Sequence, residues 1–292
     1  MVNLFRAEWR KIVSNRLVVS FTVWIFPIGA LIIYLLLLLG VMVSEELRSG
    51  LQQQNVSWTD QMNMAWSIIN NQFGRLLLLV LTAFIFASEY QWGTWKNIIP
   101  RSSRVKLVAA KFMALGAFVV IAYGSMTIVI ALGNVVSTLA IGGTVSPALN
   151  DGPALSAFAR DYALNAFTAL CSGLIAACYT ALGGIWLRSV IGGIAVGFLL
   201  TFAEESVLLV VLLLRSLIPS LSNLIGLHQF TPGYNLANIG SWATREESYL
   251  PPGLVTLLEP RSLEFSLVVV AVWLVVLLAL ILYLFRKQDI LG

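Results

Sequence analysis

Long runs of apolar residues, separated by shorter polar stretches, dominate this chain. A helix that crosses a bilayer needs about 20 mostly apolar residues, and six runs reach that length. Continuous runs of this kind differ from the short alternating strands of a membrane β-barrel. The pattern therefore predicts an all-α membrane protein with six transmembrane helices, in one membrane domain over residues 1–292. The six segments are Leu17 to Val43, Asn70 to Ser88, Leu107 to Leu132, Tyr162 to Leu187, Val190 to Leu214 and Phe265 to Phe285.

The first 16 residues carry an amphipathic pattern. Apolar positions recur at helical spacing and two cations fall on another face, with Val2, Phe5, Trp9, Ile12 and Val13 set against Arg6 and Arg10. Such a helix suits the inner membrane surface, where cations meet anionic lipid. We expect an interfacial helix over residues 1–16; a cytosolic extension of the first span is the alternative.

Composition supports the membrane assignment. The chain is 59% hydrophobic and 11% charged, whereas soluble domains have about 45–50% apolar and about 25% charged residues. Soluble enzymes, nucleic-acid binders and secreted disulfide scaffolds are thereby disfavoured. Cys171 and Cys178 lie in one apolar run and predict buried thiols, and His228 is the single histidine. We expect no metal site and no cofactor on this chain.

The distribution of positive charge predicts the orientation. Twelve of the 18 basic residues fall on one side of the six-span layout: Arg6, Arg10, Lys11, Arg16, Lys96, Arg101, Arg104, Lys106, Lys111, Arg188, Arg286 and Lys287. Cytoplasmic loops carry the excess of Lys and Arg. Both termini are therefore expected in the cytoplasm of a multi-pass plasma-membrane protein.

Small residues mark the fourth and fifth spans. Gly173, Ala177 and Ala181 form a stripe at four-residue spacing, and Gly193 and Gly197 form a GxxxG pair. Small residues let backbones approach closely where lipid offers no hydrophobic drive for association. These two spans are predicted to lie in the interior of the helix bundle.

The connection between the second and third spans is the most informative segment. Glu89 closes the second span, Gly93 permits a tight backbone, Thr94 can cap a short helix and Pro100 can end it. Basic residues then line the return into the third span. The segment suits a lever that an attached cytosolic protein could push; a positive loop serving only topology is the alternative.

This connection resembles that of the permease subunits of type-2 ATP-binding-cassette exporters. Members of that family commonly carry a glutamate after the second span, then Gly-Thr, Pro with a nearby Arg, and Lys at the start of the third span. The matching residues here are Glu89, Gly93, Thr94, Pro100, Arg101 or Arg104, and Lys111. The N-terminal helix, the six spans and the long stretch between the last two spans also resemble the family layout.

The resemblance implies a partner that hydrolyses ATP. Residues 91–103 would form the coupling helix that docks on the ATPase, with the site residues Glu89, Gly93, Thr94, Trp95, Pro100, Arg101 and Arg104. No GxxxxGK[ST] phosphate loop stands in the chain, so ATP and magnesium are expected on a separate subunit. The implied assembly holds two ATPase subunits and a second permease copy or homologue. It would export a hydrophobic or amphipathic cargo across a bacterial or archaeal plasma membrane.

Two adjacent carboxylates interrupt the fifth span. A charged residue at a helix centre costs roughly 2.5–3.5 kcal/mol on the insertion scale, and such residues usually face a bundle interior or a wet cavity. Adjacent residues point about 100° apart, so Glu204 and Glu205 cannot share one face equally. A place in the translocation pathway and hydrogen bonds to neighbouring helices both remain open.

Two stretches on the opposite side of the membrane contain apolar runs that are too short to span it. Residues 215–264 contain an apolar run broken by Pro219 and a turn followed by a short helix at Thr231 to Ile239. The length suggests re-entrant helices, which the family resemblance also implies. In the first external loop, apolar residues at helical spacing predict a membrane-surface helix: Trp58, Met62, Trp66 and Ile69.

Two other function classes stay open from the sequence. A proton-coupled secondary transporter could use Glu204 and Glu205, although the two halves show no convincing repeat. An intramembrane enzyme would need a nucleophile–base pair or a metal set, and neither HExxH nor GxSxG occurs. The chain is predicted to be a transport subunit without an active site.

Overall fold

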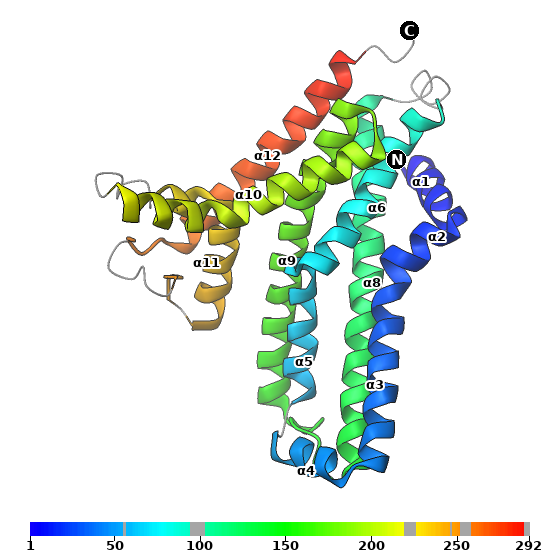
Figure 1. Cartoon of the computed structure of the whole chain (residues 1–292), viewed down its shortest axis with the longest axis vertical. Helices are drawn as coiled ribbons and strands as arrows, with labels where there is room; N and C mark the ends of the chain where they lie inside the picture. Colours follow the sequence, from blue (N-terminus) through cyan, green and yellow to red (C-terminus); the bar gives the residue numbers. More distant parts are fainter. Residues whose placement is uncertain (55–56, 94–102, 219–225, 246, 252–257, 289–292) are drawn as a thin grey trace.

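The computed structural model is built from helices, with no strand among the residues that it describes. It describes the whole chain except residues 55–56, 94–102, 219–225, 246, 252–257 and 289–292. Six helices are long and apolar enough to cross a membrane, which confirms the predicted fold class. In Figure 1, α1 (Val2–Ser14) and the end of α12 (Leu263–Lys287) lie toward the same end of the molecule.

The first span is continuous but not regular. It comprises α2 (Arg16–Val19), a π-helical turn η1 (Ser20–Trp24) and α3 (Ile25–Val43). Pro27 has no backbone N–H and so cannot bond to the carbonyl one turn earlier, which explains the irregular turn there. Asn15, with φ −89° and ψ 83°, separates α1 from this span, and its side chain accepts a hydrogen bond from the Val18 N–H.

Two helices are much longer than a bilayer requires. α8 (Arg104–Ala140) has 37 residues and α9 (Gly152–Leu187) has 36. At 1.5 Å per residue each is about 55 Å long, against about 30 Å of hydrocarbon. Both continue toward the end occupied by α4 (Glu45–Gln54) (Figure 1). α8 ends just before Gly142, which has φ +76°. α9 begins after Asp151, whose side chain accepts from the Ala154 N–H.

The connection between the first two spans, for which a membrane-surface helix was predicted, packs its apolar stripe on protein instead. Its helix α5 (Trp58–Ala65) and the 3-10 turn η2 (Trp66–Asn70) contact α8 and α9. Trp66 is 4% exposed, Ile69 is fully buried, and the Trp66 ring stacks near Tyr123. The apolar stripe is the buried face of a helix that lies against two other helices.

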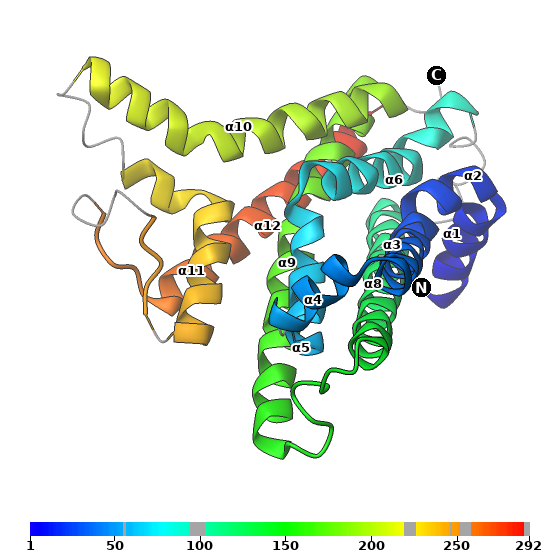
Figure 2. The ribbon, with the colours of Figure 1, turned by 60° about the horizontal axis from the view of Figure 1, so that its bottom comes forward.

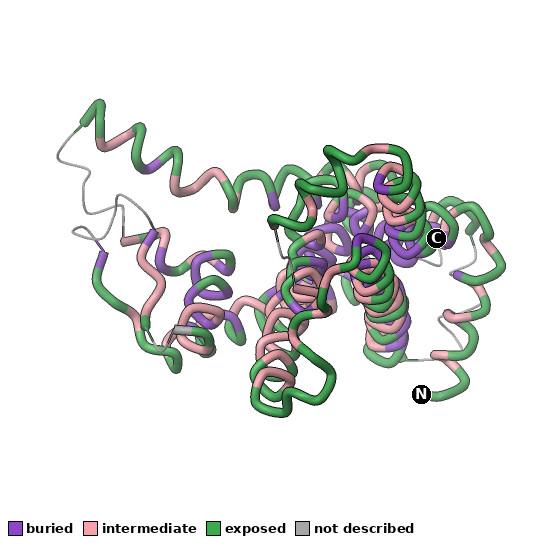
Figure 3. The backbone as a smooth tube through the Cα atoms, turned by 90° about the horizontal axis from the view of Figure 1, so that it is seen from below, coloured by how far each residue is buried: buried purple, intermediate pink, exposed green. Residues whose placement is uncertain are grey.

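The core centres on α6 (Gln72–Gln91) and the second half of α9. Gly173, Ala177 and Ala181 are all buried, as the small-residue stripe predicts, and a Cβ on Gly173 would touch Leu78 of α6. Figure 3 shows buried backbone concentrated here.

The fifth span, α10 (Val190–Leu217), differs from the predicted interior helix. It buries Gly193, Gly197, Thr201 and Val211 only, among 28 residues. Gly193 and Gly197 lie directly against Thr180 of α9, so the GxxxG pair makes the close approach expected of it. The rest of the helix extends away from the bundle above α11 (Pro232–Arg245) (Figure 2).

Candidate functional site

Four charged side chains, three of them buried, meet where α1, α6 and α8 come together. Glu8 and Lys11 come from α1, Glu89 from the last turn of α6, and Lys111 from the second turn of α8. Side-chain exposure is 7% for Glu8, 23% for Lys11, 3% for Glu89 and 1% for Lys111. We call these four residues the charge cluster.

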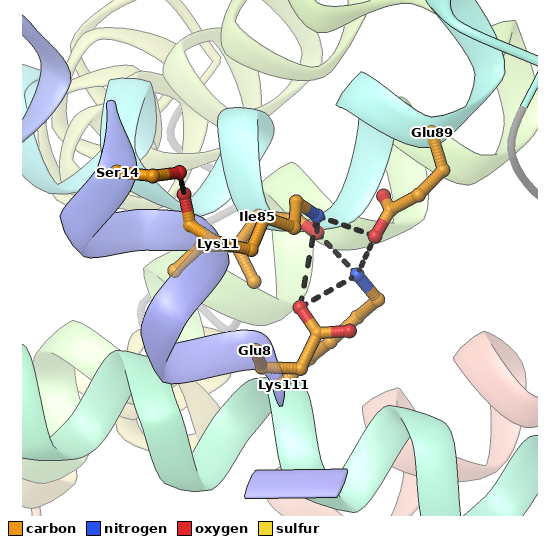
Figure 4. Close-up of polar contacts among 6 residues, drawn as sticks. All are labelled: Glu8, Lys11, Ser14, Ile85, Glu89 and Lys111. Carbon is orange, nitrogen blue, oxygen red and sulfur yellow. Dashed lines mark hydrogen bonds and ion pairs between the residues drawn. The ribbon is translucent and has the colours of Figure 1, made fainter. Parts of the chain in front are cut away.

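Each carboxylate of the charge cluster forms ion pairs with both ammonium groups (Figure 4). Both ammonium groups form ion pairs and hydrogen bonds with Oε1 of Glu89. The Oε2 atom of Glu8 lies 3.3 Å from Lys111 Nζ and 3.6 Å from Lys11 Nζ. The carbonyl oxygen of Ile85 accepts from Lys111 at 2.6 Å and from Lys11 at 3.4 Å. Two carboxylates and two ammonium groups give the charge cluster a formal charge of zero.

Local helix geometry explains how α1 reaches this position. Phe5, Trp9 and Ile12 recur on one face of α1, and Glu8 falls between them. Ile12 is fully buried, and the Trp9 ring stacks on Phe118 of α8 at 4.3 Å between ring centres. This face therefore packs on protein, while Val2 and Val13 are exposed. Whether the other face lies on the membrane surface stays a prediction.

The electrostatics follow from burial. Taking an ammonium group out of water disfavours its charged form, and a second ammonium nearby adds to this. Burial, followed by the proximity of Lys111, accordingly lowers the pKa of Lys11, against the opposing pull of Glu89 and Glu8. Glu89 Oε2 has no hydrogen-bond partner among the described residues.

A second set of contacts fixes the start of α8 to the end of α12. The Arg104 guanidinium donates to the carbonyl oxygen of Phe285 and, at 2.7 Å, to that of Arg286. A cation at the C-terminus of a helix is favoured by the helix dipole. Gln288 accepts from the Tyr90 hydroxyl at 2.6 Å and donates to the Ile185 carbonyl oxygen of α9.

The predicted coupling residues are therefore placed in part. Glu89 and Arg104 stand at the two ends of the connection and bind the charge cluster and α12. Gly93, which the sequence analysis expected to permit a tight backbone, adopts the left-handed conformation with φ +62°. Thr94, Trp95, Pro100 and Arg101, and with them most of the predicted coupling helix, lie outside the described residues. Glu8, Lys11 and Lys111 as a cluster were not predicted.

The carboxylate pair of the fifth span lies elsewhere, and its two members take different partners, as helix geometry predicts. Glu204 accepts from the Tyr179 hydroxyl at 3.1 Å and from the Gly233 N–H at 2.9 Å. Gly233 is in the first turn of α11, so Glu204 acts as an anionic cap on that helix from a neighbouring one.

Glu205 forms an ion pair with Arg75 of α6, which the sequence analysis did not single out. The Arg75 guanidinium also donates to Asn70 Oδ1 and Ser172 Oγ, each at 3.2 Å. A lone arginine one turn inside an apolar span was the signal that a partner was needed. The cavity beside Arg75 and Glu204 measures about 10 Å³, roughly the space for one water. Both carboxylates thus have partners on neighbouring helices, as the hydrogen-bonding alternative requires, and a place in the translocation pathway stays a prediction.

Among the described residues, no three His, Cys, Asp or Glu side chains come together to hold a metal ion. Cys171 and Cys178 are free thiols. His228 stacks edge-on against Tyr234, and burial lowers the pKa of its imidazole.

These features define a multi-pass helical membrane protein with charged groups tied between the helices at one end of the bundle. The sequence profile of a family described as "ABC-2 family transporter protein" matches residues 4–204. The chain belongs to this family and is a transmembrane permease of the ABC transporters, a class whose permease works with an ABC ATPase. Comparisons with curated proteins and with solved structures gave no match.

Proposed function

We propose that this chain is the membrane subunit of an ATP-driven exporter and passes the movement of its ATPase partners to the bilayer helices through the charge cluster. The supporting observation is that both ends of the connection between α6 and α8 are tied to other helices. Glu89 is bound at one end of the connection and Arg104 at the other. A force on the residues between them would therefore act on α1, α6, α8 and α12 together.

The cluster suits this role because it resists separation. A buried ion pair that loses one partner leaves an uncompensated charge, at a cost of about 3–5 kcal/mol. Pulling α1, α6 and α8 apart would incur that cost, so the three helices move together. The working assembly contains two ATPase subunits, which bind ATP and magnesium, and a second permease copy or homologue. Both termini face the cytoplasm of a bacterial or archaeal cell.

The proposed cargo is hydrophobic or amphipathic and leaves the cell. The described spans offer apolar walls, and the charged side chains buried among them are paired. Glu204 and Glu205 would contribute to the pathway by holding α11 and α6 in place around it.

The experiment is a reconstitution with and without the ATPase. The chain is purified alone and together with the ABC ATPase encoded beside it, and Mg-ATP hydrolysis is measured for both. Vesicles that hold the complex are then tested for ATP-dependent movement of an amphipathic fluorescent dye. We expect hydrolysis and movement only with the complex. Movement by the chain alone under a proton gradient would favour the secondary transporter and overturn the proposal.

A further inference from the structure

A cavity of about 770 Å³ lies between α3, α8 and the external segment α5–η2. Its volume falls in the range of about 300–1,000 Å³ typical of small-molecule sites. α3 and α8 run side by side in Figure 1, with α5 nearby. Neither the residues of the charge cluster nor Arg75 and Glu205 line the cavity.

The depth of the cavity follows from the packing of α3 on α8. The Phe26 ring lies 4.6 Å from that of Tyr123, and the Tyr34 ring covers Gly133, where a Cβ would overlap it. The first span begins at Arg16, and about 20 residues cross the hydrocarbon. The lining from Ile25 to Leu37 therefore occupies the half of the bilayer farther from α1.

The lining is mostly apolar and carries no charged side chain. Its rim is apolar as well, with Ile33 66%, Met64 74% and Phe73 56% exposed. An exposed apolar rim at membrane depth is open to acyl chains and unfavourable to water. A charged or strongly polar ligand would find no counter-charge here.

One buried polar atom in the lining has no hydrogen-bond partner among the residues that the structure describes. Ser137 is 6% exposed, and its hydroxyl makes no hydrogen bond to the described residues. Other polar groups around the cavity bind locally: Tyr34 bonds to Gln61, Ser67 donates to the Met64 carbonyl oxygen at 2.7 Å, and Asn71 caps α6. An unpaired buried hydroxyl is costly, so a ligand that supplies an acceptor oxygen beside Ser137 would be favoured.

We propose that this cavity binds one acyl chain of an outer-leaflet phospholipid, with an ester oxygen of that lipid accepting from Ser137. The chain lies along Ile25, Gly29 and Ile33 of α3 and Met126 and Ile130 of α8. The assignment to the outer leaflet rests on the orientation in the proposed function. The site itself needs neither an ATPase nor transport.

The test uses photo-crosslinking in lipid nanodiscs. The chain is reconstituted with a phosphatidylcholine that carries a diazirine in one acyl chain, irradiated, digested and mapped by mass spectrometry. We expect labelling of residues 25–34 and 126–138 to exceed that of the lipid-facing surface of α12. Equal labelling at both places would overturn the proposal.

Filling the cavity gives the matched comparison. Gly29 lines the cavity and a Cβ there meets no atom within 4 Å, so the side chain of Gly29→Phe can start into the cavity without a clash at Cβ. Displacing two methylenes of the acyl chain corresponds to about tenfold in affinity, so labelling of residues 126–138 should fall by about that factor. Ile28→Phe is the control, because Ile28 is 51% exposed and does not line the cavity.

Two further variants keep the proposal testable if Gly29→Phe misfolds. Gly29→Leu fills less of the space, and Ser137→Ala removes the unpaired hydroxyl and should lower labelling several-fold. Ser125→Ala is its control, since that hydroxyl bonds to the Ile121 carbonyl oxygen of its own helix. Unchanged labelling in the folded variants would overturn the proposal. So would an Ile33→Cys disulfide between two copies of the chain, because a second copy would then cover this face.

Discussion

Removal of Lys111 is the sharpest test of the charge cluster. In Lys111→Met the two carboxylates of the cluster retain Lys11 alone, and a negative charge is left uncompensated. Because Lys111 is 1% and Glu89 is 3% exposed, solvent screens that charge little. Loss of one partner from a buried pair costs about 3–5 kcal/mol.

The size of the effect can be read as a melting temperature. For chains of this size one kcal/mol corresponds to roughly 2–4 °C, so Lys111→Met should melt roughly 6–20 °C below the parent. The measurement is fluorescence-detected size-exclusion chromatography of heated, detergent-purified protein. Lys106→Met is the matched control, because Lys106 is exposed on the same helix; it should change stability by no more than about 0.5 kcal/mol.

The double variant separates charge from packing. Lys111→Met combined with Glu89→Gln restores a neutral cluster around Glu8 and Lys11, and neutral replacements of buried pairs are often tolerated. The double variant should therefore be more stable than Lys111→Met, with a coupling energy of at least about 2 kcal/mol. Strictly additive losses in the two single variants would refute the view that paired charge holds α1, α6 and α8 together.

Three further results are expected. Gly93→Val places a β-branched residue at φ +62°, at a cost of about 1–3 kcal/mol, and should reduce ATP-dependent dye movement more than ATP hydrolysis; equal loss of both would contradict a coupling role. Ser103→Cys and Ser248→Cys, in a background without native cysteines, should react with an impermeant thiol reagent from opposite sides of the membrane; labelling from one side would overturn the six-span topology. Glu204→Gln should assemble normally, since an amide oxygen still accepts from Gly233 N–H, whereas Glu205→Gln should lower the melting temperature because Arg75 loses its counter-charge; a size-exclusion profile and a melting curve for each variant decide this.

Hydropathy located the spans but not the full helices. The third and fourth predicted spans are Leu107 to Leu132 and Tyr162 to Leu187, whereas the helices are Arg104–Ala140 and Gly152–Leu187. The extra turns hold residues that lower hydropathy without breaking a helix. Helix ends were nevertheless readable, because Gly142 and the Asp-Gly-Pro sequence that begins at Asp151 are strong stop and start signals.

The sequence pattern did not predict the charge cluster, although the position of Glu8 was one signal of it. Apart from Glu8 and Lys11, which are three positions apart, the ion pairs join residues 22 to 103 positions apart. No local rule predicts which distant charges meet. The cations of α1 were assigned to lipid head groups because lipid is the commonest partner of a basic amphipathic helix. Glu8, however, lies on the same face as Phe5 and Ile12. An acid within an apolar stripe indicates a buried partner.

The buried charges divide the helices into those that should move together and those that can move separately. α1, α6 and α8 share the charge cluster, and Arg104 joins α8 to the end of α12. α10, by contrast, packs along α9 and α6 but buries only four residues, two of which are glycines seated on α9. Its ion pair with α6 and its cap on α11 use one carboxylate each. Polar contacts at a helix surface can exchange partners at little cost, whereas a neutral buried cluster cannot lose a member. A force applied between Glu89 and Arg104 should therefore displace α1, α6, α8 and the end of α12 as a unit. We expect the resulting change in packing to occur between this unit and α10.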